Sequence, residues 1–237
     1  MQNKIGIFDS GIGGITTYKE IKTLLPNESF IYYADTKNNP YGSKSKEELQ
    51  QITKKIVQYF IKRNVKIIII ACNTATTNCI DYLRHEFKDI TFIGTEPAIK
   101  VACDNNYKNI LILATPTTIN SERTHELIER NKKEYENCYL VACDGLAHAI
   151  EINDQNKIDE LLNKYLTPYK SKNIDAIVLG CTHYPLIRYK IQSFFKNATL
   201  IDGNKGVANM VKKQLIVNNL LNKNNKITIE FIQTKKS

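Results

Sequence analysis

Short apolar runs rich in β-branched residues alternate along the chain with longer segments of helical period. The short runs predict strands at 4–8, 29–34, 67–71, 91–94, 109–114, 136–142, 176–180, 199–201 and 227–232. The longer segments predict helices at 14–25, 46–63, 75–87, 98–105, 119–135, 145–152, 156–170, 185–195 and 204–220. Strands that alternate with helices are typical of parallel sheets with helices on their faces, so the pattern predicts an α/β fold.

Two features of the strand ends repeat along the chain. The runs ending at 71 and 180 are followed by Cys72 and Cys181. Earlier in each half, a run leads into a polar loop at Asp9 or Thr115, and the cysteine follows 63 or 66 residues later. The repeat predicts two pseudo-symmetric lobes with mostly parallel sheets flanked by helices, formed by 1–96 with 206–237 and by 97–205. Open α/β sheets bind ligands at the carboxyl ends of their strands, so we expect the active site in the cleft between the lobes.

The charge balance raises the question of nucleic acid as a partner. The chain has 237 residues and a formal net charge of +9. Arginine suits bidentate phosphate and base contacts, but only five of the 33 cations are arginine, and the lysines are spread along the whole chain. We therefore expect a solvated lysine surface, and a nucleic-acid-binding protein with a basic surface stays as the alternative outside enzymes.

Localisation and metal binding follow from what the sequence lacks. No apolar run reaches the ~18 residues of a membrane span, and the first strand begins without a signal peptide, which predicts a cytoplasmic protein. The six cysteines are scattered, as in a reducing compartment. None has the short spacing of a zinc site, and the four histidines lie far apart, so we expect no metal.

Two motifs resemble phosphate-binding loops but fail in detail. The segment 9–14 follows a strand and opens a helix, yet Thr16 stands at the third glycine position of the dinucleotide pattern. It fits better as a tight turn that presents Asp9 and Ser10, with Asp9 as a simple helix cap being the alternative. The segment 181–188 departs from the phosphatase loop because Ile187 occupies the arginine position.

The two strand-end cysteines suggest a specific chemistry. Each is expected where a loop leads into a helix N-terminus, an environment that favours a thiolate, and each has small polar neighbours. A buried structural cysteine is the alternative for either one alone. Two thiols on opposite walls of a cleft can remove a proton from one face of a stereocentre and return one to the other face. The other four cysteines, which lack the repeat relation, are expected to be structural.

Six ordered blocks carry a resemblance to a known family: 8–14, 34–36 with 39–43, 71–75, 94–98, 114–115 with 118, and 179–185. In these blocks the chain resembles the glutamate racemases of the cofactor-independent aspartate/glutamate racemase superfamily. The resemblance implies two α/β lobes, interconversion of L- and D-glutamate without a cofactor, and supply of D-glutamate for peptidoglycan. His183 favours glutamate, since aspartate racemases tend to have an acid after the Cys-Thr pair.

The resemblance also implies roles for individual residues. Cys72 and Cys181 are the acid/base thiols, Asp9 assists the first, His183 assists the second, and Glu151 is a further supporting group. A solvated helix carboxylate is the alternative for Glu151. The substrate contacts that the resemblance implies are Asp9, Ser10, Pro40, Tyr41, Gly42, Asn73, Thr74, Thr115, Thr118, Thr182 and His183.

Three further expectations concern specificity and assembly. A racemase for aspartate or another small amino acid remains the nearest alternative, because it would use the same thiol pair. The resemblance implies a homodimer. The first strand begins at about Lys4, which leaves no N-terminal extension of the kind through which a cell-wall precursor activates some relatives, so we expect no such activation.

Overall fold

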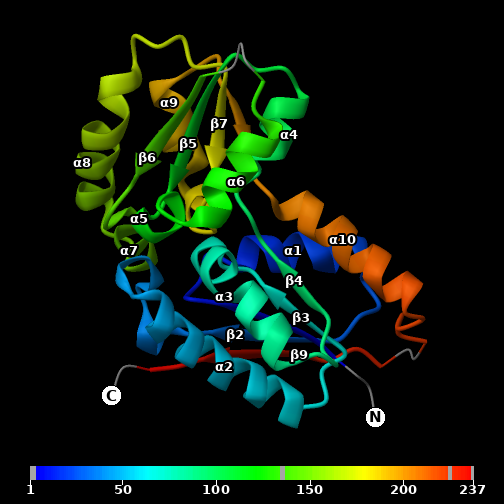
Figure 1. The fold of residues 1–237 in the computed structure, drawn as a ribbon. Helices are drawn as coiled ribbons and strands as arrows, with labels where there is room; N and C mark the ends of the chain where they lie inside the picture. Colours follow the sequence, from blue (N-terminus) through cyan, green and yellow to red (C-terminus); the bar gives the residue numbers. More distant parts are fainter. Residues whose placement is uncertain (1–3, 134–136, 224–225, 236–237) are drawn as a thin grey trace. The chain divides into compact units, whose positions relative to one another are not determined.

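The computed structural model describes residues 4–133, 137–223 and 226–235, which form two compact units (Figure 1). Unit 1 comprises Met1–Thr95 and Asn204–Ser237, and unit 2 comprises Glu96–Gly203. The chain therefore passes from one unit to the other at 95/96 and at 203/204. The boundaries expected from the sequence are 96/97 and 205/206.

Unit 1 is built around a five-stranded parallel sheet with the order β4-β3-β1-β2-β9. Its strands are β1 (Ile5–Asp9), β2 (Phe30–Ala34), β3 (Ile67–Ile70), β4 (Phe92–Gly94) and β9 (Ile229–Gln233). Its helices are α1 (Ile15–Leu24), α2 (Lys46–Lys62), α3 (Asn73–Glu86) and α10 (Asn204–Val217), with 3₁₀ turns at Thr36–Asn38 and Tyr41–Ser43.

Unit 2 contains a four-stranded parallel sheet with the order β6-β5-β7-β8. Its strands are β5 (Asn109–Ala114), β6 (Asn137–Ala142), β7 (Ala176–Leu179) and β8 (Thr199–Ile201). Its helices are α4 (Ile99–Asp104), α5 (Pro116–Ile119), α6 (Glu122–Asn131), α7 (Leu146–Glu151), α8 (Gln155–Leu166) and α9 (Arg188–Phe194), with 3₁₀ turns at Thr167–Tyr169 and Tyr184–Ile187. Read from its other end, the order β8-β7-β5-β6 repeats β4-β3-β1-β2, which confirms the predicted α/β fold with a pseudo-symmetric repeat.

The apolar strands are buried on both faces, which is why they read as continuous apolar runs in the sequence. In β3, Ile67 and Ile69 belong to the core that α1 and α10 cover, while Ile68 and Ile70 belong to the core under α2 and α3. Unit 2 has a corresponding pair of cores on the two faces of its sheet. Figure 1 shows the helices on both faces of each sheet.

The helix predicted at 119–135 is wrong in its boundaries, because Ile119 ends the preceding helix α5 and Ser121 caps a new helix inside the segment. The Thr118 N–H donates to the Thr115 hydroxyl at the start of α5, and the Thr124 N–H donates to the Ser121 hydroxyl at the start of α6. Helix α6 ends at Asn131, and the predicted residues 134 and 135 lie outside the described ones. The same holds for residue 136, the first of the strand predicted at 136–142.

A second correction concerns the helix predicted at 185–195. This segment begins as the 3₁₀ turn Tyr184–Ile187 and becomes α-helical only at Arg188. The other predicted elements are present, with ends that differ by a few residues from those expected.

A buried ion pair holds the segment after α10 against the rest of unit 1. Lys66 Nζ lies 2.5 Å from Glu28 Oε2, and both side chains are less than 5% exposed. Lys66 also donates to the Leu220 carbonyl, and the Asn222 N–H donates to the other Glu28 oxygen. Each buried charge therefore has further hydrogen-bond partners, which offset the cost of removing it from water.

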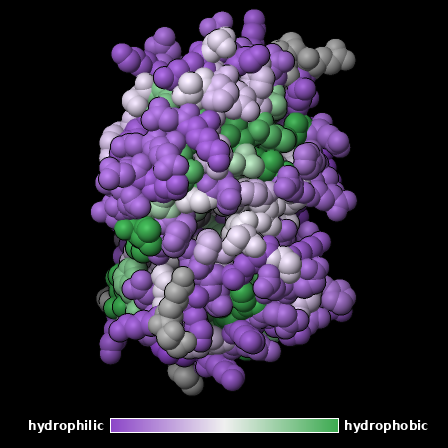
Figure 2. Space-filling view, turned by 90° about the vertical axis from the view of Figure 1, so that its left-hand side faces the viewer, coloured by the Kyte–Doolittle hydropathy of each residue, from purple (hydrophilic) through white to green (hydrophobic). Residues whose placement is uncertain are grey.

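The face of the molecule drawn in Figure 2 is mostly polar. Figure 2 shows hydrophilic residues over most of the visible face, with small apolar patches between them. Within 4–133, 137–223 and 226–235, no helix is both long enough and apolar enough to cross a membrane.

Candidate active site

The first half-site lies in unit 1, at the carboxyl ends of the neighbouring strands β1 and β3. Asp9 ends β1 and Ser10 follows it, while Cys72, Asn73 and Thr74 follow β3. All five residues are buried, with exposed fractions of 6% or less. Parallel strands bring their carboxyl ends to one edge of the sheet, so this half-site is a direct product of the topology.

Asp9 is held by the turn that starts α1. The N–H groups of Gly11 and Gly14 both donate to Asp9 Oδ2 at 3.1 Å. A Cβ atom at Gly14 would lie only 2.7 Å from the Cβ of Asp9 and 2.9 Å from that of Ala71, so glycine is needed for this close approach. These contacts stabilise the turn before α1, whose N-cap residue is Gly14 without a side-chain cap, so the alternative of Asp9 as a simple helix cap does not describe them.

Cys72 occupies the N-cap position of α3, a helix of 14 residues. Its Sγ lies 4.0 Å from the Ser10 hydroxyl. The N-terminal end of a helix favours negative charge and therefore the thiolate form of a cysteine. Next to it, Asn73 Oδ1 is buried and has no hydrogen-bond partner among the described residues, which makes it a free acceptor for a ligand N–H.

A buried tyrosine completes the first half-site. The Tyr41 hydroxyl donates to Asp35 Oδ2 at 2.7 Å. Burial, together with the Asp35 carboxylate and more weakly Cys72 and Asp9, raises the pKa of Tyr41 well above its ordinary value. Tyr41 is therefore a neutral phenol at physiological pH.

The loop around Tyr41 is attached to the half-site by its neighbours. The Asn39 side-chain amide donates to the Ser10 carbonyl at 3.1 Å. Pro40 and Gly42 flank Tyr41 and are partly exposed. The eight predicted site residues of unit 1 thus lie at two strand ends and on one loop linked to them.

The second half-site lies in unit 2, around the carboxyl end of β7. Cys181, Thr182 and His183 follow this strand and are buried. His183 Nδ1 lies 3.8 Å from Cys181 Sγ and 3.5 Å from the Thr182 hydroxyl. His183 Nε2 lies 2.6 Å from Glu151 Oε2, at the end of α7.

This arrangement sets the proton positions on the imidazole ring. A carboxylate next to Nε2 favours a proton on that nitrogen, which leaves Nδ1 as the acceptor in neutral His183. Nδ1 can then take the proton of the Cys181 thiol, and the imidazolium that forms is paired with Glu151. The Glu151 side chain is only 11% exposed and is hydrogen-bonded to His183 Nε2, so the alternative of a solvated carboxylate does not describe it.

Two threonines occupy the adjacent strand end. The Thr115 and Thr118 hydroxyls lie 3.0 Å apart, and the Thr118 N–H donates to Thr115 at 3.3 Å. Strand β5, which ends before Thr115, pairs with β7. A Cβ atom at Gly180 would lie 2.8 Å from the Leu113 carbonyl, so only glycine lets the strand ends before Thr115 and Cys181 pack this closely.

The expected helix N-terminus is present at only one of the two cysteines. Cys72 directly precedes the long helix α3, as predicted. Cys181 is instead followed by the four-residue 3₁₀ turn Tyr184–Ile187, because the chain becomes α-helical only at Arg188. The aligned peptide dipoles available to Cys72 are therefore lacking at Cys181, where His183 is the nearest ionisable partner.

Two of the remaining cysteines have the environment of structural thiols. Burial raises the pKa of Cys79 to about 12 and that of Cys143 to about 12. These two thiols therefore stay protonated at physiological pH.

Two residues of these half-sites have no expected role in the sequence analysis. Asp35 accepts the Tyr41 hydrogen bond and is itself buried. Tyr184 is fully buried, and burial with the nearby Cys143 and Cys181 raises its pKa well above the ordinary value. Both lie inside the matching blocks 34–36 and 179–185, which are the only sequence signal for them.

No group of three or more His, Cys, Asp or Glu side chains among the described residues is arranged to hold a metal ion.

Comparison with known proteins assigns the family. The model of the family described as Asp/Glu/Hydantoin racemase matches residues 5–211. A curated glutamate racemase of Clostridium acetobutylicum is 41% identical over 223 residues, covering 93% of this chain and 87% of the relative.

Two solved structures are similar over nearly the whole chain. A glutamate racemase from Francisella tularensis in complex with D-glutamate has a TM-score of 0.86 at 32% identity, covering 100% of this chain and 89% of that one. The Escherichia coli glutamate racemase, in complex with L-glutamate and the activator UDP-MurNAc-ala, has a TM-score of 0.81 at 26% identity. The match covers 98% of this chain and 99% of that one. The resemblance inferred from the sequence blocks is confirmed, and the chain belongs to the Asp/Glu/Hydantoin racemase family.

Proposed function

We propose that this racemase interconverts L-glutamate and D-glutamate by proton transfer at the α-carbon, with Cys72 and Cys181 as the two acid/base thiols. The observation that carries the proposal is their equivalent position. One follows β3 and the other follows β7, the strands that correspond in the repeated sheet order. The names of the relatives support glutamate as the substrate.

In the proposed reaction, one thiolate removes the α-proton and the opposite thiol donates a proton to the other face of the same carbon. The bond to the first hydrogen breaks as a bond to sulfur forms, and the electron pair left on carbon accepts the second proton. The two cysteines exchange protonation states in each turnover, so the product leaves the enzyme ready for the reverse reaction. No oxidant or other reactant is consumed.

The two half-sites supply different support for their thiols. His183, paired with Glu151, takes up and returns the Cys181 proton. Cys72 has the N-terminus of α3 and the Ser10 hydroxyl beside it, and we assign Asp9 the role of assisting it. The α-proton of an amino acid is weakly acidic, so preorganised donors must stabilise the developing charge.

Substrate binding is proposed to use the short polar side chains around each thiol. The unpartnered Asn73 Oδ1 suits the substrate ammonium, and the hydroxyls of Ser10, Thr74, Thr115, Thr118 and Thr182 suit its carboxylates. Pro40, Tyr41 and Gly42 form the loop that we assign to the same substrate.

The cellular context is part of the proposal. D-glutamate would enter peptidoglycan, and the protein would act in the cytoplasm as a homodimer without a cofactor. These assignments are supported by the family resemblance in the sequence.

Circular dichroism of purified protein with L-glutamate, D-glutamate or L-aspartate tests the proposed activity. Both glutamate signals should decay to zero without added cofactor, while the aspartate signal stays constant. Decay of aspartate alone would make this an aspartate racemase and would refute the specificity argument from His183. Constant signals in all three samples would refute the proposal.

A further inference from the structure

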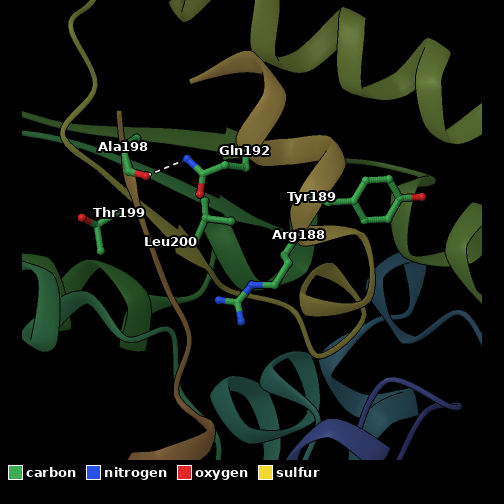
Figure 3. Close-up of a pocket in the computed structure, with 6 residues that line it drawn as sticks. All are labelled: Arg188, Tyr189, Gln192, Ala198, Thr199 and Leu200. Atoms are coloured by element: carbon green, nitrogen blue, oxygen red, sulfur yellow. Dashed lines mark hydrogen bonds between the residues drawn. The ribbon is translucent and has the colours of Figure 1, made fainter. Parts of the chain in front are cut away.

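A pocket of about 400 Å³ lies in unit 2 between α9 and β8, outside both half-sites. Six residues line it: Arg188, Tyr189, Gln192, Ala198, Thr199 and Leu200. Figure 3 shows the Arg188 side chain extending from α9 on the side of Leu200, while the Tyr189 ring points the other way. Arg188 is the only charged residue of the lining, and Ala198 and Leu200 provide an apolar surface.

The N–H donors of the Arg188 guanidinium are available to a ligand. It has five N–H donors, but the structure gives it no hydrogen bond within the described part of the chain. It forms a long ion pair with Asp202, whose Oδ2 lies 3.8 Å from Nη2, beyond hydrogen-bond distance. The side chain is about half exposed, so its donors can be reached from solvent.

The edge of the sheet adds a second donor. β8 is the last strand of its sheet, and no other described strand pairs with its outer side. The Thr199 N–H donates toward β7, to the Asp175 carbonyl. Since successive residues of a strand alternate in direction, the N–H of Leu200 is turned to the unpaired outer side of β8, and Leu200 itself lines the pocket.

The pocket wall is fixed before any ligand arrives. The Gln192 side-chain amide donates to the carbonyls of Phe195 and Ala198, both at 2.8 Å. The second of these bonds is drawn in Figure 3. These bonds hold the turn between α9 and β8 against the helix, so a ligand would not have to order it.

We propose that this pocket binds a small anion, a molecule with one carboxylate or phosphate group on a short apolar body. The anion takes its hydrogen bonds from the Arg188 guanidinium and the Leu200 N–H, and its apolar part lies on Ala198 and Leu200. It competes with Asp202 for Arg188. Asp202 lies two residues before Asn204, where the chain passes into unit 1, so occupancy of the pocket changes the contacts of this connecting segment.

The small number of arginines makes a direct test possible. Protein labelled with ¹⁵N-arginine should give five Nε–Hε signals, one for each of the five arginines. Inorganic phosphate and acetate are titrated separately at constant ionic strength, with chloride as the reference anion. We expect the Arg188 signal, assigned by its loss in Arg188→Gln, to shift and saturate with at least one of the two anions. The signals of the other arginines should shift less and without saturation.

Variants separate binding in the pocket from general attraction to a basic protein. Arg188→Gln should weaken anion binding about tenfold or more, the loss of one charge-assisted contact, as followed through the backbone N–H signal of Leu200 in uniformly ¹⁵N-labelled protein. Arg130→Gln is the matched control, since Arg130 is exposed and paired with Glu126, and it should leave the Arg188 titration unchanged. Tighter binding of phosphate or of acetate identifies the ligand class. Equal, unsaturable shifts of all five signals, or unchanged affinity in Arg188→Gln, would overturn the proposal.

Discussion

The two half-sites have the same position in corresponding sheets but surround their cysteines with different chemistry. Cys72 lies at the start of a long helix, 4.0 Å from a hydroxyl. Cys181 precedes only a short 3₁₀ turn and has a buried imidazole–carboxylate pair next to it. The two units therefore place a thiol at the same position of the repeated sheet. The groups that stabilise its thiolate differ between the units.

This difference matters for a racemase because the two enantiomers present their α-protons on opposite faces. In the proposed mechanism each thiol is the base in one direction and the acid in the other. The helix N-terminus near Cys72 stabilises the thiolate through a fixed electrostatic field, whereas His183 can itself carry the proton of Cys181. The two half-sites should therefore respond differently to substitution, and the following changes test this in order of decreasing effect.

Replacing either thiol should have the largest effect. Cys72→Ser and Cys181→Ser should each lower racemisation by about 10²–10⁴-fold or more, because serine is a far weaker acid and each thiol is a proton-transfer group. The assay is circular dichroism with either enantiomer of glutamate, with thermal unfolding as the check on the fold. Cys138→Ser, at a partly exposed position outside both half-sites, is the control and should keep wild-type turnover. Turnover near wild type in either thiol variant would contradict the two-thiol assignment.

Substitutions in the proton relay should come next. Glu151→Gln and His183→Asn should lower kcat by about 10–10²-fold, since they remove assistance to Cys181 and leave the thiol in place. Racemisation has an equilibrium constant of one, so kcat/KM must fall equally in both directions. The pH profile of kcat provides a second readout. Loss of the Glu151 carboxylate should change the pH range in which kcat depends on proton transfer through His183. An unchanged profile and unchanged kcat would show that the pair is only structural.

In the other half-site, Asp9→Asn distinguishes stabilisation of the turn before α1 from a role in catalysis. The amide oxygen can still accept from Gly11 and Gly14, so the free energy of unfolding should fall by less than about 1 kcal/mol. If Asp9 assists Cys72, kcat should nevertheless fall by about tenfold or more. Denaturant unfolding and racemase kinetics on the same sample provide the comparison. Wild-type kcat would show that Asp9 only stabilises the turn before α1.

Gly14→Ala tests the packing that brings the first half-site together. The new Cβ atom would lie under 3 Å from Asp9, Ala71 and the Tyr32 hydroxyl, and overpacking of this kind costs about 1–3 kcal/mol of stability. Gly206→Ala is the matched control in α10, where a Cβ atom meets nothing within 4 Å and alanine favours the helix. Thermal unfolding should show a lower Tm for the first variant and an equal or higher Tm for the second. Equal Tm values for both would show that the turn at Gly14 can relax.

The raised pKa of Cys79 predicts a small effect of pH on stability. Folding favours the protonated thiol, so this contribution is complete below the ordinary thiol pKa and is lost as pH rises from about 9 toward about 12. Wild type should therefore lose up to about 1.4 kcal/mol more per pH unit in this range than Cys79→Ala. Urea unfolding at pH 8 and pH 10 measures the difference between the two proteins. Equal losses would contradict the pKa assigned to this thiol.

The sequence predicts most of the fold because local signals and the fold agree. The apolar run at 67–70 becomes the fully buried strand β3, and the segment 46–63 matches α2, whose N-terminus has a capping box at Ser45 and Glu48. The prediction fails at 119–135, where the capping hydroxyl of Ser121 interrupts a continuous helical pattern. Propensity averaged over a segment does not detect a competing side-chain hydrogen bond.

The candidate site is predictable only in part. The cysteines, Asp9 and Thr115 follow from the repeated strand ends, because the carboxyl ends of parallel strands converge. The pairing of His183 with Glu151 joins residues 32 positions apart, and that of Tyr41 with Asp35 depends on a loop conformation. The Arg188 pocket has no sequence signal, since it results from the packing of one helix against one strand edge.

Exchange of the α-hydrogen in D₂O tests the central claim most directly, because it follows each thiol separately. In Cys181→Ser the remaining Cys72 should still exchange the α-hydrogen of one enantiomer of glutamate, with retention of configuration. In Cys72→Ser the remaining Cys181 should exchange only the other enantiomer. ¹H NMR of L- and D-glutamate with each variant gives the four rates. Exchange of the same enantiomer by both variants, or of both enantiomers by either one, would contradict the account of one thiol for each face.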